Sequence, residues 1–126
     1  MPQNGLAVRE EQIALCHTML DTLLQNKIAL CDAGVGIGKT YAYLTACVLL
    51  KRFFPSPQPV VVSTSSVALQ NAVIGEYIPF LSRIFLENRI IQKPIRAIVR
   101  KGKECFVCDV RLKFRLEAVE GKRKNE

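Results

Sequence analysis

Apolar positions along the chain alternate between helical spacing and short unbroken runs. Apolar side chains recur every three or four residues over 8–26 and dominate 39–54, which predicts two helices. Further helices are predicted over 65–74, 77–86 and 109–119. Three continuous apolar runs predict buried strands, and they cover 27–31, 60–64 and 95–99. Strands that alternate with helices indicate an α/β fold with a parallel sheet.

A glycine-rich loop separates the first predicted strand from the second predicted helix. It reads Ala33-Gly34-Val35-Gly36-Ile37-Gly38-Lys39-Thr40 and fits the Walker A pattern (Ala or Gly)-x-x-x-x-Gly-Lys-Thr. Glycines let backbone N–H groups close around phosphate oxygens, and the following helix adds the positive end of its dipole. Lys39 would then reach the β- and γ-phosphates, and the Thr40 hydroxyl would coordinate Mg²⁺. The pattern predicts an ATP–Mg²⁺ site; the alternative is a glycine-rich turn that happens to precede Lys-Thr.

Composition narrows the class of protein. The chain has 126 residues, of which 49% are hydrophobic and 23% charged, so a disordered chain is excluded. No apolar stretch approaches the length of a transmembrane helix, and no export signal is apparent at the N-terminus. Five cysteines, an odd number, argue against a closed disulfide framework. We therefore expect a cytoplasmic protein with reduced thiols and no membrane partner.

The positive charge is concentrated in the last third of the chain. The formal net charge is +7, and residues 1–88 contribute none of it because their acidic and basic side chains balance. A polyanion such as nucleic acid is a plausible partner for 89–126. The alternative is a solvated basic surface, which stays open for 89–115 and is the favoured interpretation for the tail over 121–126.

Four motifs in order resemble the N-terminal part of DinG-like DNA helicases, in the XPD-related branch of superfamily 2. The motifs are Arg9-x-x-Gln12, the loop within Cys31 to Leu44, Ser63 to Gln70, and Lys101 to Cys108 followed by Arg111-Leu112. The resemblance covers about residues 9–112 and implies a partial RecA-like P-loop domain. It implies nucleotide contacts by Arg9, Gln12 and Tyr41 beside the loop, with Gln12 reading the adenine. An exposed polar position on a helix is the alternative for Gln12.

The same resemblance implies two further sites. Ser63, Thr64, Leu69 and Gln70 fall on a motif that lies against single-stranded DNA; helix capping by Ser65 or Ser66 is the alternative for this segment. Cys108 matches the first cysteine ligand of a 4Fe-4S cluster. Cys105 and Cys108 form one Cys-x-x-Cys pair with no second pair after it, so the chain alone cannot build a cluster that needs four ligands. An unliganded thiol is the alternative for Cys108.

The motifs needed for hydrolysis are not all present. No Asp-Glu pair, typical of Walker B, occurs in the chain, and 126 residues leave no room for a second motor domain. We expect the N-terminal portion of a helicase domain over 1–100, the start of an iron–sulfur insertion over 101–120 and a basic tail over 121–126. The C-terminal motor domain would be required in cis. The alternatives are a stand-alone basic module that binds single-stranded nucleic acid with a vestigial P-loop, and, less favoured, a small complete P-loop kinase or NTPase.

Overall fold

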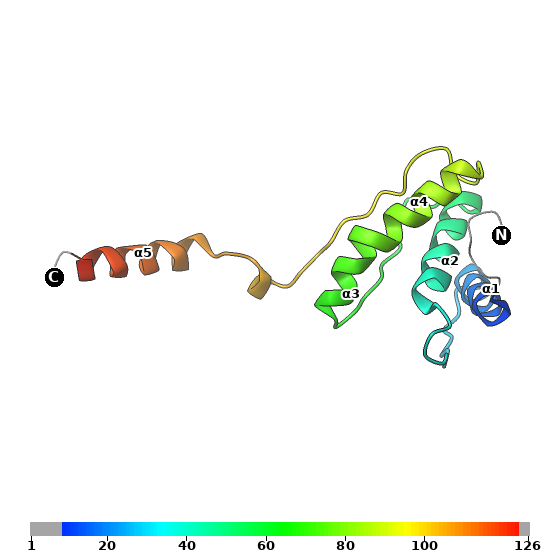
Figure 1. Cartoon of the computed structure of the whole chain (residues 1–126), viewed down its shortest axis with the longest axis horizontal. Helices are drawn as coiled ribbons and strands as arrows, with labels where there is room; N and C mark the ends of the chain where they lie inside the picture. The colour runs from blue at the N-terminus through cyan, green and yellow to red at the C-terminus, as the bar shows by residue number, and fades with distance from the viewer. Residues whose placement is uncertain (1–8, 124–126) are drawn as a thin grey trace.

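A computed structural model describes residues 9–123, and the regular structure over this range is helical (Figure 1). The α-helices are α1 (Glu10–Leu24), α2 (Lys39–Phe53), α3 (Val67–Ala72), α4 (Ile78–Glu87) and α5 (Asp109–Arg123). A π-helical turn, η2 (Val73–Tyr77), joins α3 to α4, and a short 3₁₀ helix, η3 (Lys103–Cys105), precedes α5. The five predicted helices are confirmed to within a few residues. Val8, the predicted start of the first helix, and residues 124–126 of the basic tail lie outside the described residues.

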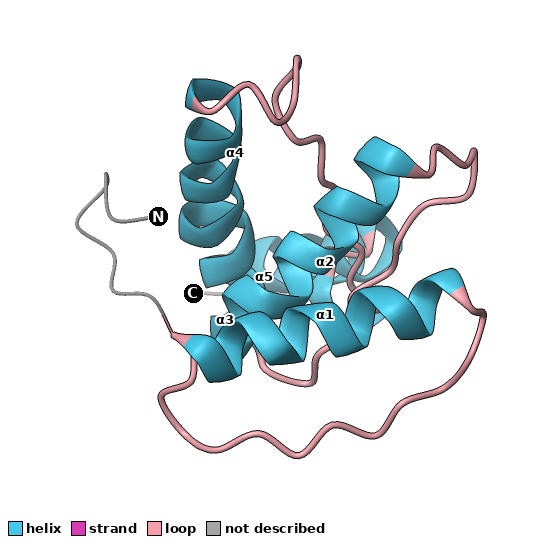
Figure 2. Cartoon of the chain, turned by 90° about the vertical axis from the view of Figure 1, so that its right-hand side faces the viewer, coloured by secondary structure: helices cyan, strands magenta, loops and turns pink. Residues whose placement is uncertain are grey.

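The predicted parallel sheet is wrong, because residues 9–123 form no strand (Figure 2). The partial RecA-like α/β fold that depended on this sheet is corrected with it. The three apolar runs at 27–31, 60–64 and 95–99 are irregular chain. A run becomes a strand only when a neighbour pairs with its N–H and C=O groups, and no backbone hydrogen bond joins these runs within the described chain. Ile28 and Leu30 are consequently 101% and 102% exposed.

The hydrophobic core lies between α2 and α4. Leu44 of α2 and three residues of α4 form its buried cluster, and these three are Leu81, Ile84 and Phe85. Tyr41 extends the packing, with its ring 4.9 Å from that of Tyr77 in an edge-to-face arrangement. On its other side α2 packs against α1. Ala42 and Ala46, one turn apart on α2 and 2% and 0% exposed, are small enough to permit this close helix packing.

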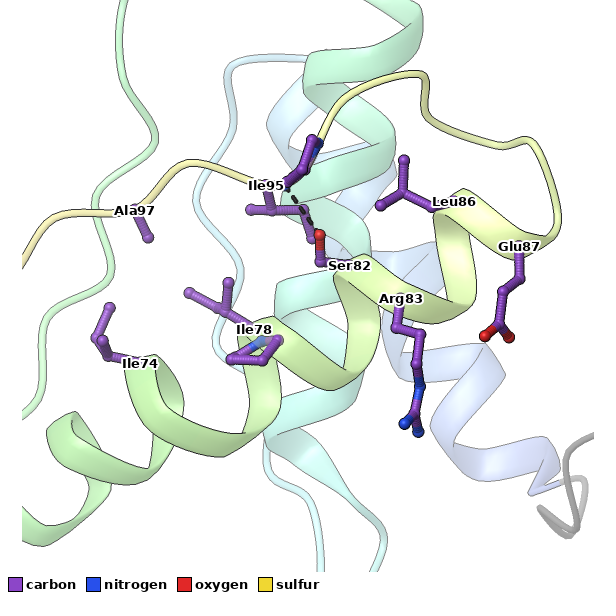
Figure 3. A pocket seen from close by; sticks show the side chains of 10 residues that line it. Ile74, Ile78, Ser82, Arg83, Leu86, Glu87, Ile95 and Ala97 are labelled. Atoms are coloured by element: carbon purple, nitrogen blue, oxygen red, sulfur yellow. Dashed lines mark hydrogen bonds between the residues drawn. The ribbon is translucent and has the colours of Figure 1, made fainter.

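The third apolar run lies beside α4 instead of in a sheet. The Ser82 side chain, 8% exposed, accepts a hydrogen bond from the backbone N–H of Ile95 at 3.1 Å (Figure 3). Ile74, Ile78 and Ala97 line a shallow pocket along the same contact. Partial burial of Ile95 against the core thus takes the place of strand pairing at the start of this run.

The last helix stands apart from the others. α5 contacts no other helix, and an extended segment leads to it from the core (Figure 1). The side chains of 96–121 are exposed. Among the described helices, none combines the length and the apolar character that a membrane span requires.

Candidate functional site

The glycine-rich loop lies between the first apolar run and α2. Gly36 and Gly38 have φ angles of +84° and +82°, in the left-handed region where a side chain would be strained. Gly38 is the residue that immediately precedes α2, so its backbone turns the chain into the helix. Lys39 and Thr40 therefore begin the first turn of α2, as the sequence predicted.

The loop presents cationic and neutral hydrogen-bond donors at one helix end. Lys39 Nζ donates to the carbonyl of Ala33 at 2.8 Å and so joins the two ends of the loop. Within residues 9–123, no hydrogen bond occupies the N–H groups of 34–41. Donors at a helix N-terminus, together with a lysine, suit an anion with several oxygens. The chemistry of these donors is compatible with a nucleoside triphosphate, and the partly buried Thr40 would supply a hydroxyl ligand for Mg²⁺; both assignments stay predictions.

Gln12 of α1 and Arg9, the residue at the N-cap of this helix, each donate a hydrogen bond to the loop. Gln12 Nε2 donates to the carbonyl of Gly38 at 2.9 Å. Arg9 donates through Nη1 to the carbonyl of Gly36. Arg9 and Gln12, which the sequence predicts to contact the nucleotide, therefore both lie against the loop. The adenine contact of Gln12 stays a prediction, and its amide N–H is engaged by the loop itself.

The segment predicted to contact DNA has a local structural role as well. Ser66 caps α3 by accepting from the backbone N–H of Leu69 at 3.2 Å. Thr64 Oγ1 accepts from the N–H of Ser66 at 3.1 Å. The capping interpretation is therefore confirmed for Ser66, and DNA contact by Ser63, Thr64, Leu69 and Gln70 stays a prediction.

A wide cleft of about 1190 Å³ runs from α2 past the 60–65 segment to the extended 95–102 segment. Ser63, Thr64 and Gln70 line it, whereas Leu69 does not. Its basic lining residues are Lys51, Arg52, Lys93, Arg96, Arg100 and Lys101, and none of the described residues that line it is acidic. Sequence reasoning missed Lys51 and Arg52, because cations are ordinary in the last turn of a helix. No local signal showed that they line the same cleft as the later basic segment.

Most of the chain is similar in sequence to known proteins. Over 105 residues, 83% of the chain, the sequence is 30% identical to the protein named 3'-5' exonuclease DinG from Staphylococcus aureus strains USA300 and NCTC 8325. Over this stretch the chain is similar to these DinG proteins. It spans 11% of the length of these curated relatives. No family model matches the chain, and no solved structure matches it.

The two cysteines that precede α5 differ in environment from those on α1 and α2. Cys105 and Cys108 are exposed, and residues 9–123 contain no group of three or more side chains that could hold a metal ion. The ligand set of a 4Fe-4S cluster is therefore not gathered within this range, and Cys108 as a cluster ligand stays a prediction. Cys16 and Cys47 are partly buried on α1 and α2, and burial raises the pKa of both thiols. The neighbouring Cys16 raises the pKa of Cys47 further.

Proposed function

We propose that this DinG-like stretch binds ATP with Mg²⁺ through residues 33–40, as part of an ATP-dependent DNA helicase. The observation that carries the proposal is the arrangement at the start of α2. There, two left-handed glycines lead into the helix, and Lys39 Nζ lies 2.8 Å from the carbonyl of Ala33. Mg²⁺, when bound, would neutralise phosphate charge and orient the phosphates.

Each loop residue has a defined task in this proposal. The backbone N–H groups of 34–39 donate to phosphate oxygens. Lys39 exchanges the neutral carbonyl of Ala33 for a charged phosphate oxygen, because a hydrogen bond between two charged groups is roughly twice as strong as one between neutral groups. The hydroxyl oxygen of Thr40 would coordinate Mg²⁺. Tyr41, whose ring packs on Tyr77 in the core, anchors the first turn of α2 beneath the site.

The proposal assigns nucleotide binding, and not hydrolysis, to this stretch. Phosphoryl transfer needs a metal-holding acid and a charge-stabilising arginine, and the chain has no Asp-Glu pair. We assign the arginine to a C-terminal motor domain that would act in cis, and the acid to helicase sequence that follows the motifs of this stretch. We also assign no exonuclease step to residues 9–123, because they contain no group of three or more metal-ligating side chains.

The test compares ATP–Mg²⁺ binding by the wild type and by Lys39→Ala in a calorimetric titration. We expect the variant to bind about tenfold or more weakly, because a hydrogen bond to a charged group contributes roughly 1.5–3 kcal/mol. Lys27→Ala is the matched control, since Lys27 is an exposed lysine that precedes the loop. Equal affinity in the wild type and Lys39→Ala would show that the site is wrong.

The wide cleft favours nucleic acid as the second ligand. In the helicase proposal, single-stranded DNA lies along the cleft and contacts Ser63, Thr64 and Gln70. The same cleft also favours a second candidate function, a stand-alone module that binds single-stranded nucleic acid with a vestigial phosphate loop. This second function is supported by the lining of the cleft, which has six basic residues and no acidic residue among those described. The cytoplasmic location predicted from the sequence belongs to both proposals.

A titration with a labelled single strand tests both. Binding should weaken steeply with salt, because basic residues that neutralise phosphates release counterions. It should also weaken when four basic residues are neutralised together, three in the extended segment and one in η3: Arg96, Arg100, Lys101 and Lys103. In the stand-alone module, ATP leaves DNA affinity unchanged and Lys39→Ala binds DNA like the wild type. In the helicase proposal, ATP–Mg²⁺ changes the DNA affinity of the wild type and not of Lys39→Ala. Binding indifferent to salt would remove both DNA assignments.

A further inference from the structure

We infer that Gln12 is a positioning residue for the phosphate-binding loop, an inference that rests on the proposed function. In this role Gln12 controls the affinity for the triphosphate, whatever base is attached to it. Its carboxamide acts on the loop through the carbonyl of Gly38. This role differs from adenine recognition, because it requires no contact between Gln12 and the base. Three observations carry it.

The first observation is where Gln12 binds. Its Nε2 donates to the carbonyl of Gly38 at 2.9 Å, and the same carbonyl accepts the N–H of Ala42 at 3.2 Å. The bond to Ala42 is the first helical hydrogen bond of α2. Gln12 therefore joins α1 to the point where the loop becomes helix.

The second observation is how closely the amide approaches. A Cβ atom at Gly38 would collide with Gln12 Nε2 and lie 3.2 Å from Gln12 Cδ. At Gly36, which has nearly the same φ, a Cβ would meet nothing within 4 Å. The close approach at Gly38 is therefore specific to the Gln12 contact and does not follow from the backbone conformation alone.

The third observation is a paired contact from Arg9. Arg9 and Gln12 are three residues apart, so they lie on one side of the start of α1, and they bind the carbonyls of Gly36 and Gly38 respectively. A trans peptide group is planar and its C=O and N–H point in opposite directions. When these two carbonyls are held toward α1, the N–H groups of Ile37 and Lys39 are turned away from α1. Gln12 thereby preorganises donors that the phosphates need, which raises affinity because less ordering is left to occur on binding.

The experiment uses Gln12→Met, which keeps the length of the side chain and removes the donor. Binding of ATP–Mg²⁺, GTP–Mg²⁺ and inorganic tripolyphosphate–Mg²⁺ is measured for the wild type and the variant. We expect the variant to lose the same factor, roughly 3- to 10-fold, for all three ligands, as loss of one hydrogen bond predicts. Glu11→Gln, at an exposed neighbour on α1, is the matched control and should bind all three like the wild type.

Hydrogen exchange of the ligand-free chain gives a second readout. The amide of Ala42, which donates to the same Gly38 carbonyl as Gln12, should exchange faster in Gln12→Met than in the wild type, while amides within α4 stay unchanged. Loss of ATP affinity with tripolyphosphate affinity intact would overturn the inference in favour of base reading. Unchanged affinities together with unchanged exchange would also overturn it. If the wild type binds no triphosphate better than Lys39→Ala, the proposed function fails, and the exchange comparison still decides whether Gln12 holds the loop.

Discussion

At the scale of single residues, Gly36 and Gly38 form a natural comparison. Both have left-handed backbones, with φ of +84° and +82°, but only Gly38 lies against Gln12. We predict that Gly36→Ala and Gly38→Ala each lose roughly 1–2 kcal/mol of unfolding free energy through backbone strain. Gly38→Ala should lose about 1 kcal/mol more, because its Cβ displaces the Gln12 amide from its hydrogen bond. Urea unfolding of both variants measures the difference.

A double variant separates the strain from the collision. In the Gln12→Ala background, Gly38→Ala should cost no more unfolding free energy than the backbone strain alone, because no Gln12 amide then remains to be displaced. Equal losses in the two single glycine variants would contradict the contact between Gln12 and Gly38.

At the scale of elements, the start of α3 depends on one hydroxyl. Ser66 Oγ accepts from the backbone N–H of Leu69, one of the first-turn N–H groups that have no partner within the helix itself. We predict that Ser66→Ala lowers the free energy of unfolding by about 1 kcal/mol. Ser65→Ala, at the exposed neighbouring serine, is the control and should change it by less than about 0.5 kcal/mol. Equal effects of the two substitutions in urea unfolding would contradict the assigned cap.

The packing of α1 on α2 makes stability depend on alkaline pH. Burial raises the pKa of Cys16 and Cys47, and it also raises the pKa of Tyr41, with further contributions from Tyr77 and Glu76. A raised pKa means that the folded state favours the neutral form of the group. For a thiol, this stabilisation of the folded state is complete below the ordinary pKa of about 8.5 and is lost as the pH rises through the raised pKa. We predict that the free energy of unfolding falls above about pH 8.5.

Two cysteine variants check the origin of this pH dependence. Unfolding at a series of pH values should show a shallower fall in Cys47→Ala than in the wild type, because one buried thiol no longer has to ionise. Cys108→Ala, at an exposed cysteine, should follow the wild-type profile. A wild-type profile that is flat to pH 10.5 would contradict the raised pKa values.

Helices could be predicted from the sequence because their signals are local. The apolar spacing of 8–26 and the serine before Val67 lie within the elements that they specify. The strand prediction at 27–31, 60–64 and 95–99 failed because a strand also needs a partner, which apolar composition does not supply. The loop was predictable as a motif. The bond from Gln12 to Gly38 was not, because it arises from the packing of α1 beside α2 and no spacing rule encodes that contact.

At the scale of the whole molecule, apolar side chains are divided between a small core and exposed irregular segments. Leu81 is 6% exposed within the core cluster, whereas Leu30 is 102% exposed in the segment before the loop. The two leucines therefore differ in how much apolar surface folding removes from water, although their chemistry is identical. Exposed apolar surface also favours association between chains.

This contrast gives a prediction about where the folding energy resides. Leu81→Ala should lose roughly 2–5 kcal/mol of unfolding free energy through lost burial and a cavity. Leu30→Ala should stay within about 0.5 kcal/mol of the wild type, because the folded chain leaves that side chain in water. Urea unfolding measures both losses, and light scattering should show less self-association in a variant with Ile28→Ser and Leu30→Ser. A loss above roughly 2 kcal/mol in Leu30→Ala would place the first apolar run in a core, which contradicts the exposed conformation of this segment.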